Sequence, residues 1–292
     1  MSASSPLFRF VQVELPWPLG PPDGRYLVRA PEAPDAAPTH VIVFATLGAP
    51  ERRRRVARRG PRPADPEPPP TPVATGRATV IDAGHPLEDV AAAQAWLEAA
   101  GEDDLAAGLA ILNRALHAFR LASADPYLQP VGRAQTIAAR VGFGAGEQVA
   151  DGLWSDARDL PAPDDRRPRR GGRRTMLAPQ ARLAAALGAR QPPLACEELT
   201  LRARLDQDHD RPREAALQLL VALDAAIAEL SADPHAAALA QRLTQLRELR
   251  ADAGAAAQAA LGGPLTDQQA AVVATGVGRI EAALRARTAE TG

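Results

Sequence analysis

The first hundred residues alternate between apolar and polar positions with a period of two, which is the repeat of a half-buried β-strand. These runs are rich in Val, Ile and aromatic residues, and a proline or glycine follows each of them within a few positions. Too few residues separate the first two runs for a helical crossover, so we expect antiparallel neighbours. The pattern predicts strands over residues 7–15, 26–28, 40–47 and 78–83, and a helix over residues 86–100.

From residue 102 onward the hydrophobic period becomes helical. Large apolar residues recur every three or four positions from Leu105 to Phe119, and the same spacing returns over residues 216–230 and 273–284. Each of these segments therefore presents one apolar stripe, and we expect the helices to pack on one another. The predicted fold class is α+β: a small, mostly antiparallel sheet with a covering helix over residues 1–101, followed by an all-helical region of helical hairpins over residues 102–292.

Two places in the second region have the sequence of a helix N-terminus. Thr266 and Gln269 have the spacing of a capping box. Asp233 is followed by Pro234, which combines a capping side chain with a residue that is tolerated in the first helical turn. We expect helices to begin at both places.

Two arginine-rich segments interrupt this order. Residues 51–72 contain seven arginines and residues 161–175 contain six; both have a composition typical of disordered loops. With acidic residues counted, Glu51 to Arg62 carries about +6 and Asp164 to Arg174 about +4, which leaves about −11 on the rest of a chain whose net charge is −1. We therefore expect two basic segments on an acidic body.

The arginines of these segments are candidate contacts to phosphate groups or to an acidic partner, because guanidinium groups displace counterions and stack on bases. The alternatives are that the segments are solvated linkers, or that they pair with the acidic body or with another subunit. The candidate residues are Arg52, Arg53, Arg54, Arg55, Arg58, Arg59, Arg62, Arg166, Arg167, Arg169, Arg170, Arg173 and Arg174.

Composition excludes several chemistries. All 34 basic residues are arginine, so the usual P-loop, kinase, pyridoxal and Ser-x-x-Lys mechanisms lack their essential lysine. The single cysteine, Cys196, cannot form an intramolecular disulfide or a multi-thiolate metal site. The N-terminus does not have the pattern of a signal peptide, and no run of about 20 apolar residues exists. We predict a cytoplasmic protein without membrane contact or cofactor.

Local motifs for cofactor or metal binding are incomplete. The glycines of residues 140–147 lack the spacing of a dinucleotide loop, and we expect them to end or bend a helix or to let Trp154 pack close to the backbone. The acidic cluster at residues 206–210 begins like a calcium loop, but Arg211 occupies the position of the required glycine. A polar turn between helices is the expected structure there.

Three short stretches share a helical pattern in which a small residue precedes a large apolar residue and then an Ala-Leu pair. The stretches that begin at Asp103 and Asp210 align without gaps, and Gly152–Ala157 matches the beginning of the pattern. This pattern resembles the second half of a tetratricopeptide repeat, with anchors at Gly108, Ala157 and Ala215. The resemblance implies helical hairpins that present a surface to protein partners; alanine-rich amphipathic helices of any bundle are the alternative.

These observations favour a non-catalytic interaction, adaptor or scaffold protein, whose helical region binds a protein partner or a second copy of the chain through apolar helix faces. The first alternative is nucleic-acid binding through the two arginine-rich segments. The second is an enzyme of an unidentified class, whose residues converge only in the folded chain. Such an enzyme would bring together several of His40, His85, Asp151, Cys196 and His209 in one pocket.

Overall fold

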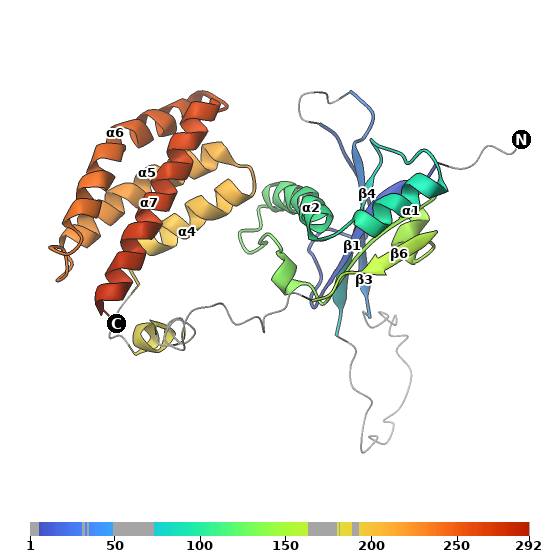
Figure 1. The fold of residues 1–292 in the computed structure, drawn as a ribbon, viewed down its shortest axis with the longest axis horizontal. Coiled ribbons are helices and arrows are strands. Elements are labelled where there is room, and N and C mark those ends of the chain that lie inside the picture. The colour runs from blue at the N-terminus through green and yellow to red at the C-terminus, as the bar shows by residue number, and fades with distance from the viewer. Residues whose placement is uncertain are drawn as a thin grey trace, which may run out of the picture. The chain divides into compact units, whose positions relative to one another are not determined.

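The computed structural model describes residues 6–30, 33, 35–48, 73–162, 180, 182–188 and 193–291 (Figure 1). Contacts within the chain divide it into two compact units, Met1–Arg167 and Pro168–Gly292. Each unit is described by itself. The hydrophobic pattern places the division after residue 101, whereas the contacts place it after residue 167.

A six-stranded sheet forms the centre of the first unit. Its strands are β1 (Phe8–Leu15), β2 (Gly24–Val28), β3 (His40–Leu47), β4 (Thr75–Asp82), β5 (Ala138–Gly144) and β6 (Asp156–Asp159). Their order across the sheet is β2-β3-β4-β1-β5-β6, and every neighbouring pair is antiparallel. An antiparallel sheet with helices, followed by a region of packed helices, confirms the predicted fold class.

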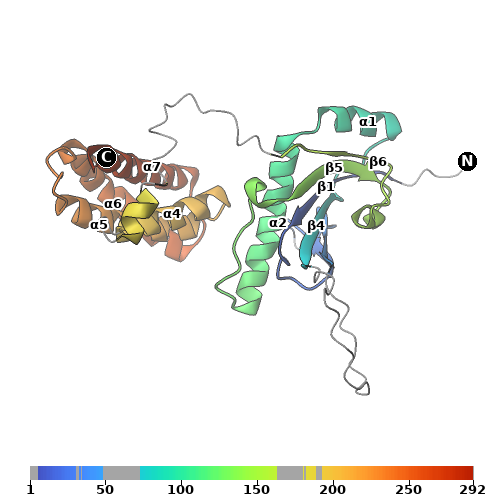
Figure 2. The same ribbon diagram turned by 90° about the horizontal axis from the view of Figure 1, so that it is seen from below.

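Helices α1 (Val90–Ala99) and α2 (Glu102–Ser123) contribute to the core on one face of this sheet (Figure 2). Buried side chains of β1 and β3 meet buried leucines of α2, such as Leu112, in that core. The approach of α2 to β1 is close at Gly108, where an added Cβ would lie 2.8 Å from Val11. A glycine at this helical position therefore brings the helix onto the sheet.

Helix α1 begins at Val90, four residues later than the predicted start at Pro86. The carboxylate of Asp89 accepts a hydrogen bond from the N–H of Ala92 at 2.8 Å and so caps the helix. The preceding Leu87 instead forms an antiparallel bridge with Leu7. The residues before Asp89 thus extend the sheet and do not belong to the helix.

The prediction that everything after residue 102 is helical is wrong for β5 and β6. Gly142 and Gly144 lie within β5, where they neither end nor bend a helix. An added Cβ at Gly144 would lie 3.2 Å from the Cα of Trp154, so these glycines do let Trp154 pack close to the backbone. Ala157, one of the three repeat-like anchors, lies in β6, so the stretch that contains it forms a strand.

The described part of the second unit consists mainly of four long helices, preceded by a short helical segment at residues 182–187. Helix α5 packs on the other three, and their apolar stripes meet in a core rich in alanine and leucine. Small side chains permit close helix packing, as at Gly276, where an added Cβ would lie 2.8 Å from Leu219. The long helices are α4 (Ala195–Asp208), α5 (Pro212–Ser231), α6 (Ala240–Gly262) and α7 (Asp267–Thr291).

One of the two predicted helix starts in this unit is confirmed. The N–H of Thr266 donates to Gln269, and the N–H of Gln269 donates back to the Thr266 hydroxyl, which is a capping box before α7. The predicted start at Pro234 is wrong, because α6 begins only at Ala240. Asp233 instead accepts a hydrogen bond from Arg287 of α7 at 2.6 Å, which ties the turn between α5 and α6 to α7.

Candidate functional site

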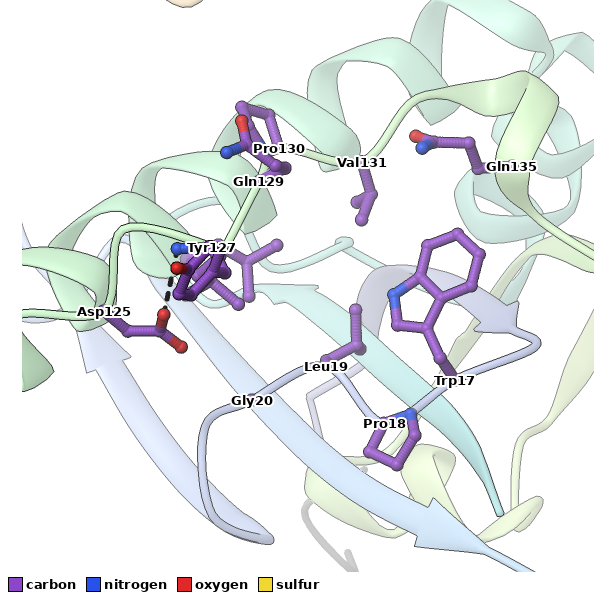
Figure 3. A pocket seen from close by; sticks show the side chains of 12 residues that line it. Trp17, Pro18, Leu19, Gly20, Asp125, Tyr127, Gln129, Pro130, Val131 and Gln135 are labelled. Carbon is purple, nitrogen blue, oxygen red and sulfur yellow. Dashed lines mark hydrogen bonds between the residues drawn. The ribbon is translucent and has the colours of Figure 1, made fainter. Parts of the chain in front are cut away.

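A pocket of about 390 Å³ opens in the first unit, between the connection from β1 to β2 and the segment that joins α2 to β5 (Figure 3). Figure 3 shows Trp17 and Tyr127 on opposite sides of it. We call it the Trp–Tyr pocket. It is lined by Trp17, Pro18, Leu19, Gly20, Leu116, Asp125, Tyr127, Leu128, Gln129, Pro130, Val131 and Gln135.

The first wall is fixed by the way β1 ends. Pro16 and Pro18 cannot donate backbone hydrogen bonds to a neighbouring strand, so the chain leaves the sheet after Leu15. Gly20 then adopts a φ of +100°, which favours glycine, and an added Cβ there would lie 2.9 Å from Leu128 in the opposite wall. The two walls thus approach each other closely at Gly20.

The second wall is fixed by hydrogen bonds to the end of α2. Ala124 closes the helix in the left-handed conformation, with its N–H directed to carbonyls of the last turn. The carboxylate of Asp125 then accepts a hydrogen bond from the N–H of Tyr127 at 2.9 Å. This local turn places the ring of Tyr127 at the mouth of the pocket, where it is 87% exposed.

Asn113, the only asparagine of the chain, holds the far end of the same wall. Its side chain is buried on α2, where its amide donates to the carbonyl of Val131 at 2.9 Å and accepts from the N–H of Val131 at 2.8 Å. The side chain thus imitates a β-strand partner and satisfies both backbone groups of a residue that lines the pocket. The wall is therefore anchored at both of its ends.

The chemistry of the lining suits binding. Besides Trp17, which is 40% exposed, and Tyr127, the lining holds two prolines and three leucines. The polar side chains among its described residues are two glutamines and one carboxylate, Asp125; no arginine, histidine, serine or cysteine is among them. Exposed aromatic rings on an anchored backbone can hold an apolar ligand, with the few polar groups fixing its orientation.

The thirteen candidate arginines all lie outside the described residues, and the structure does not test them.

Of the five residues considered for an enzyme, His40 and His85 come near each other at the end of the sheet opposite the Trp–Tyr pocket. There, the ring of His85 lies 3.2 Å from Asp82, and burial lowers the pKa of His40 against the opposing effect of that carboxylate. Asp151 ends the short helical turn after β5 in the same unit, whereas Cys196 and His209 belong to the second unit.

Cys196 is buried in the second unit beside Glu229 of α5. Burial, together with hydrogen bonding to Glu229, raises the pKa of the thiol to about 12. The protonated thiol is a poor nucleophile at neutral pH. The carboxylate of Glu229 instead accepts hydrogen bonds from the N–H groups of Ala195 and Cys196 at 3.0 Å each, and these bonds outweigh burial in lowering its pKa. Glu229 therefore caps α4 from a neighbouring helix.

The acidic cluster at residues 206–210 forms the expected turn between helices. Asp206 accepts hydrogen bonds from Arg211, both from its guanidinium at 2.8 Å and from its backbone N–H at 2.9 Å. Throughout the described ranges, no three histidine, cysteine, aspartate or glutamate side chains are grouped closely enough to hold a metal ion. None of the helices in the described part of the chain combines the length and hydropathy needed to cross a bilayer.

Comparison with known proteins gives no relative. No family model, curated protein or solved structure matches this chain. The function must therefore be inferred from the site itself.

Proposed function

We propose that the chain is a non-catalytic interaction protein that binds a segment of a partner protein in the Trp–Tyr pocket. The observation that carries this proposal is that Tyr127 is 87% exposed where it lines a pocket whose walls are anchored by Asn113 and Asp125. A large ring held in solvent contributes little to folding. Its surface is available to a ligand, and tyrosine is enriched at protein interfaces for this reason.

The pocket supports this function better than the apolar helix stripes do. The leucines of α2 from Leu105 to Leu116 pack against the sheet, and the stripes of α5 and α7 are buried inside the second unit. The large apolar side chains of α5 that remain exposed are those of Leu217 and Val221. A patch of two exposed apolar side chains is ordinary on a protein surface and does not indicate a partner.

A photo-crosslinker in place of Tyr127 tests the proposed function. We expect benzoylphenylalanine at position 127 to form a discrete protein adduct on irradiation in the source cells. The same amino acid at Leu153 is the matched control, because Leu153 is 67% exposed in the same unit but lies in the connection from β5 to β6, at the opposite end of the sheet. Equal adducts at both positions, or none at position 127, would contradict the proposal.

Nucleic-acid binding is a second candidate, and the sheet topology favours it. Residues 51–72 connect β3 to β4, and residues 161–175 follow β6. Because β6 runs antiparallel to β4, the end of β6 and the start of β4 lie at the same end of the sheet. Three strand spacings of about 4.8 Å place these two points about 14 Å apart. Both basic segments are thus attached within reach of one polyanion.

Binding to labelled single-stranded and duplex DNA and RNA over a salt series tests this second candidate. We expect a steep negative slope of log K against log salt, about −0.9 for each duplex phosphate neutralised, and its loss when all thirteen candidate arginines become glutamine. A control variant with the exposed residues Arg202, Arg250 and Arg285 changed to glutamine should keep the slope. Absence of binding near physiological salt would eliminate this candidate.

A further inference from the structure

We propose that the Trp–Tyr pocket binds an extended, proline-rich segment of a partner protein that carries an arginine or lysine beside its prolines. This inference rests on the proposed function and names the chemistry of the partner. It follows from three properties of the described lining: its rings, its hydrogen-bond donors and its charge.

The rings of the lining match proline side chains. Trp17 and Tyr127 lie on opposite sides of the pocket, with Leu19 and Val131 between them (Figure 3). A proline-rich segment adopts the polyproline II helix, which has three residues per turn and displays a rigid ring on each of its faces. Such rings dock between aromatic side chains, and this is a recurrent mode of peptide recognition.

The polar groups of the lining match the backbone of such a segment. A polyproline II helix has no internal hydrogen bonds, so its carbonyl groups need donors from the site. The indole nitrogen of Trp17 lies on the side of the ring that faces Leu19 (Figure 3), and an indole can only donate. The side-chain oxygen of Gln135 already accepts a hydrogen bond from the N–H of Gly132 at 2.7 Å. The NH₂ group of Gln135 is therefore the part of this side chain that can donate to a carbonyl of the ligand.

The charge of the lining selects a basic residue in the ligand. Among the described residues that line the pocket, Asp125 is the one with a charged side chain, and none of them is a cation. One oxygen of Asp125 accepts the N–H of Tyr127, while the carboxylate keeps its second oxygen for an arginine or lysine of the ligand. The same charge disfavours phosphate-bearing ligands at this pocket.

The anchored walls reduce the cost of binding. Asn113 and the Asp125 turn hold the second wall, and β4 supports the first, since an added Cβ at Gly76 would lie 2.6 Å from the backbone oxygen of Trp17. A pocket with a fixed backbone loses little conformational entropy when it is filled, and a polyproline II segment is itself stiff. Both partners are therefore organised for the complex before they meet.

Fluorescence anisotropy with the labelled peptide Arg-Pro-Pro-Pro-Pro-Pro tests the proposal on the full chain. We expect Trp17→Ala and Tyr127→Ser each to weaken binding by about tenfold or more, which corresponds to about 1.4 kcal/mol. Trp17→Phe, which keeps a ring and loses the N–H donor, should lie between these variants and the wild type. Leu153→Ser is the matched control with an exposed apolar residue outside the pocket, and its affinity should not change.

The charge and conformation of the ligand are tested separately. Asp125→Asn should weaken binding of the arginine peptide severalfold and leave a peptide with glutamine in place of arginine unaffected. Equal affinity for a peptide in which glycine replaces alternate prolines would overturn the proposal, because that peptide has lost its stiffness. Binding only to a variant that lacks residues 52–70 would also overturn it, because the chain's own prolines would then be the occupant. The first result would leave a crosslink between position 127 and a partner protein intact, so the proposed function would stand. The second predicts an adduct within the chain itself, which would contradict the proposed function as well.

Discussion

Replacing Ile42 by aspartate is expected to unfold the first unit. The side chain of Ile42 is fully buried in β3, on the sheet face whose core also contains buried residues of α2. An isolated carboxylate in such a site costs several kcal/mol even after its pKa rises to keep it neutral. A domain has about 5–15 kcal/mol of stability in total. We therefore expect this unit of the variant either to be unfolded already at 25 °C, with no cooperative thermal transition, or to have a much lower melting temperature.

Leu27→Asp is the matched control for this substitution. Leu27 lies on the adjacent edge strand β2, paired with Val41, and its side chain is 42% exposed. A carboxylate there remains hydrated, so the melting temperature should fall by much less. Circular dichroism melts of the two variants give the comparison, and a native-like transition for Ile42→Asp would show that β3 is not a core strand.

Replacing Asn113 by alanine is expected to destabilise the first unit by about 2–4 kcal/mol, because it leaves a buried N–H and a buried carbonyl without partners. Both unpaired groups belong to Val131, which the Asn113 side chain satisfies at 2.8 and 2.9 Å. Val131 also lines the Trp–Tyr pocket. The same substitution should therefore weaken binding of the proline-rich peptide under conditions where the variant is still folded.

Ser123→Ala on the same helix separates this effect from a general loss in α2. Ser123 is exposed, and its hydroxyl bonds only to carbonyls of its own helix. We expect the free energy of unfolding of the Ser123→Ala variant to stay within about 0.5 kcal/mol of the wild-type value. Urea denaturation measures both variants, and equal stabilities for them would show that Asn113 does not hold the loop.

The elements that could be predicted from the sequence are those whose local pattern agrees with their place in the sheet. β1, β3 and β4 are rich in β-branched and aromatic residues and alternate clearly, so their positions follow from periodicity. β5 has the sequence AARVGFG, in which alanines and glycines weaken the strand signal. Its pairing with β1 across seven residues, which no local window contains, makes it a strand.

The site could not be predicted, because its two walls are more than a hundred residues apart in the sequence. Local signals for each wall are present: Trp17 lies between two prolines, and Tyr127 follows Pro126. Aromatic residues beside prolines in a connection are unusual enough to draw attention, but only the fold shows that they face one pocket. The arginine-rich segments were evident from composition, and they remain a prediction.

The most direct test of the account is the shift of the Trp17 indole N–H in a ¹⁵N-correlated NMR spectrum during titration with Arg-Pro-Pro-Pro-Pro-Pro. The chain has three tryptophans, and the other two are engaged elsewhere: Trp96 packs against Arg9, and Trp154 packs against Phe10 and Arg140. We expect the Trp17 signal to move saturably while the signals of Trp96 and Trp154 stay in place. An unmoved Trp17 signal at saturating peptide, or equal shifts of all three, would contradict the account.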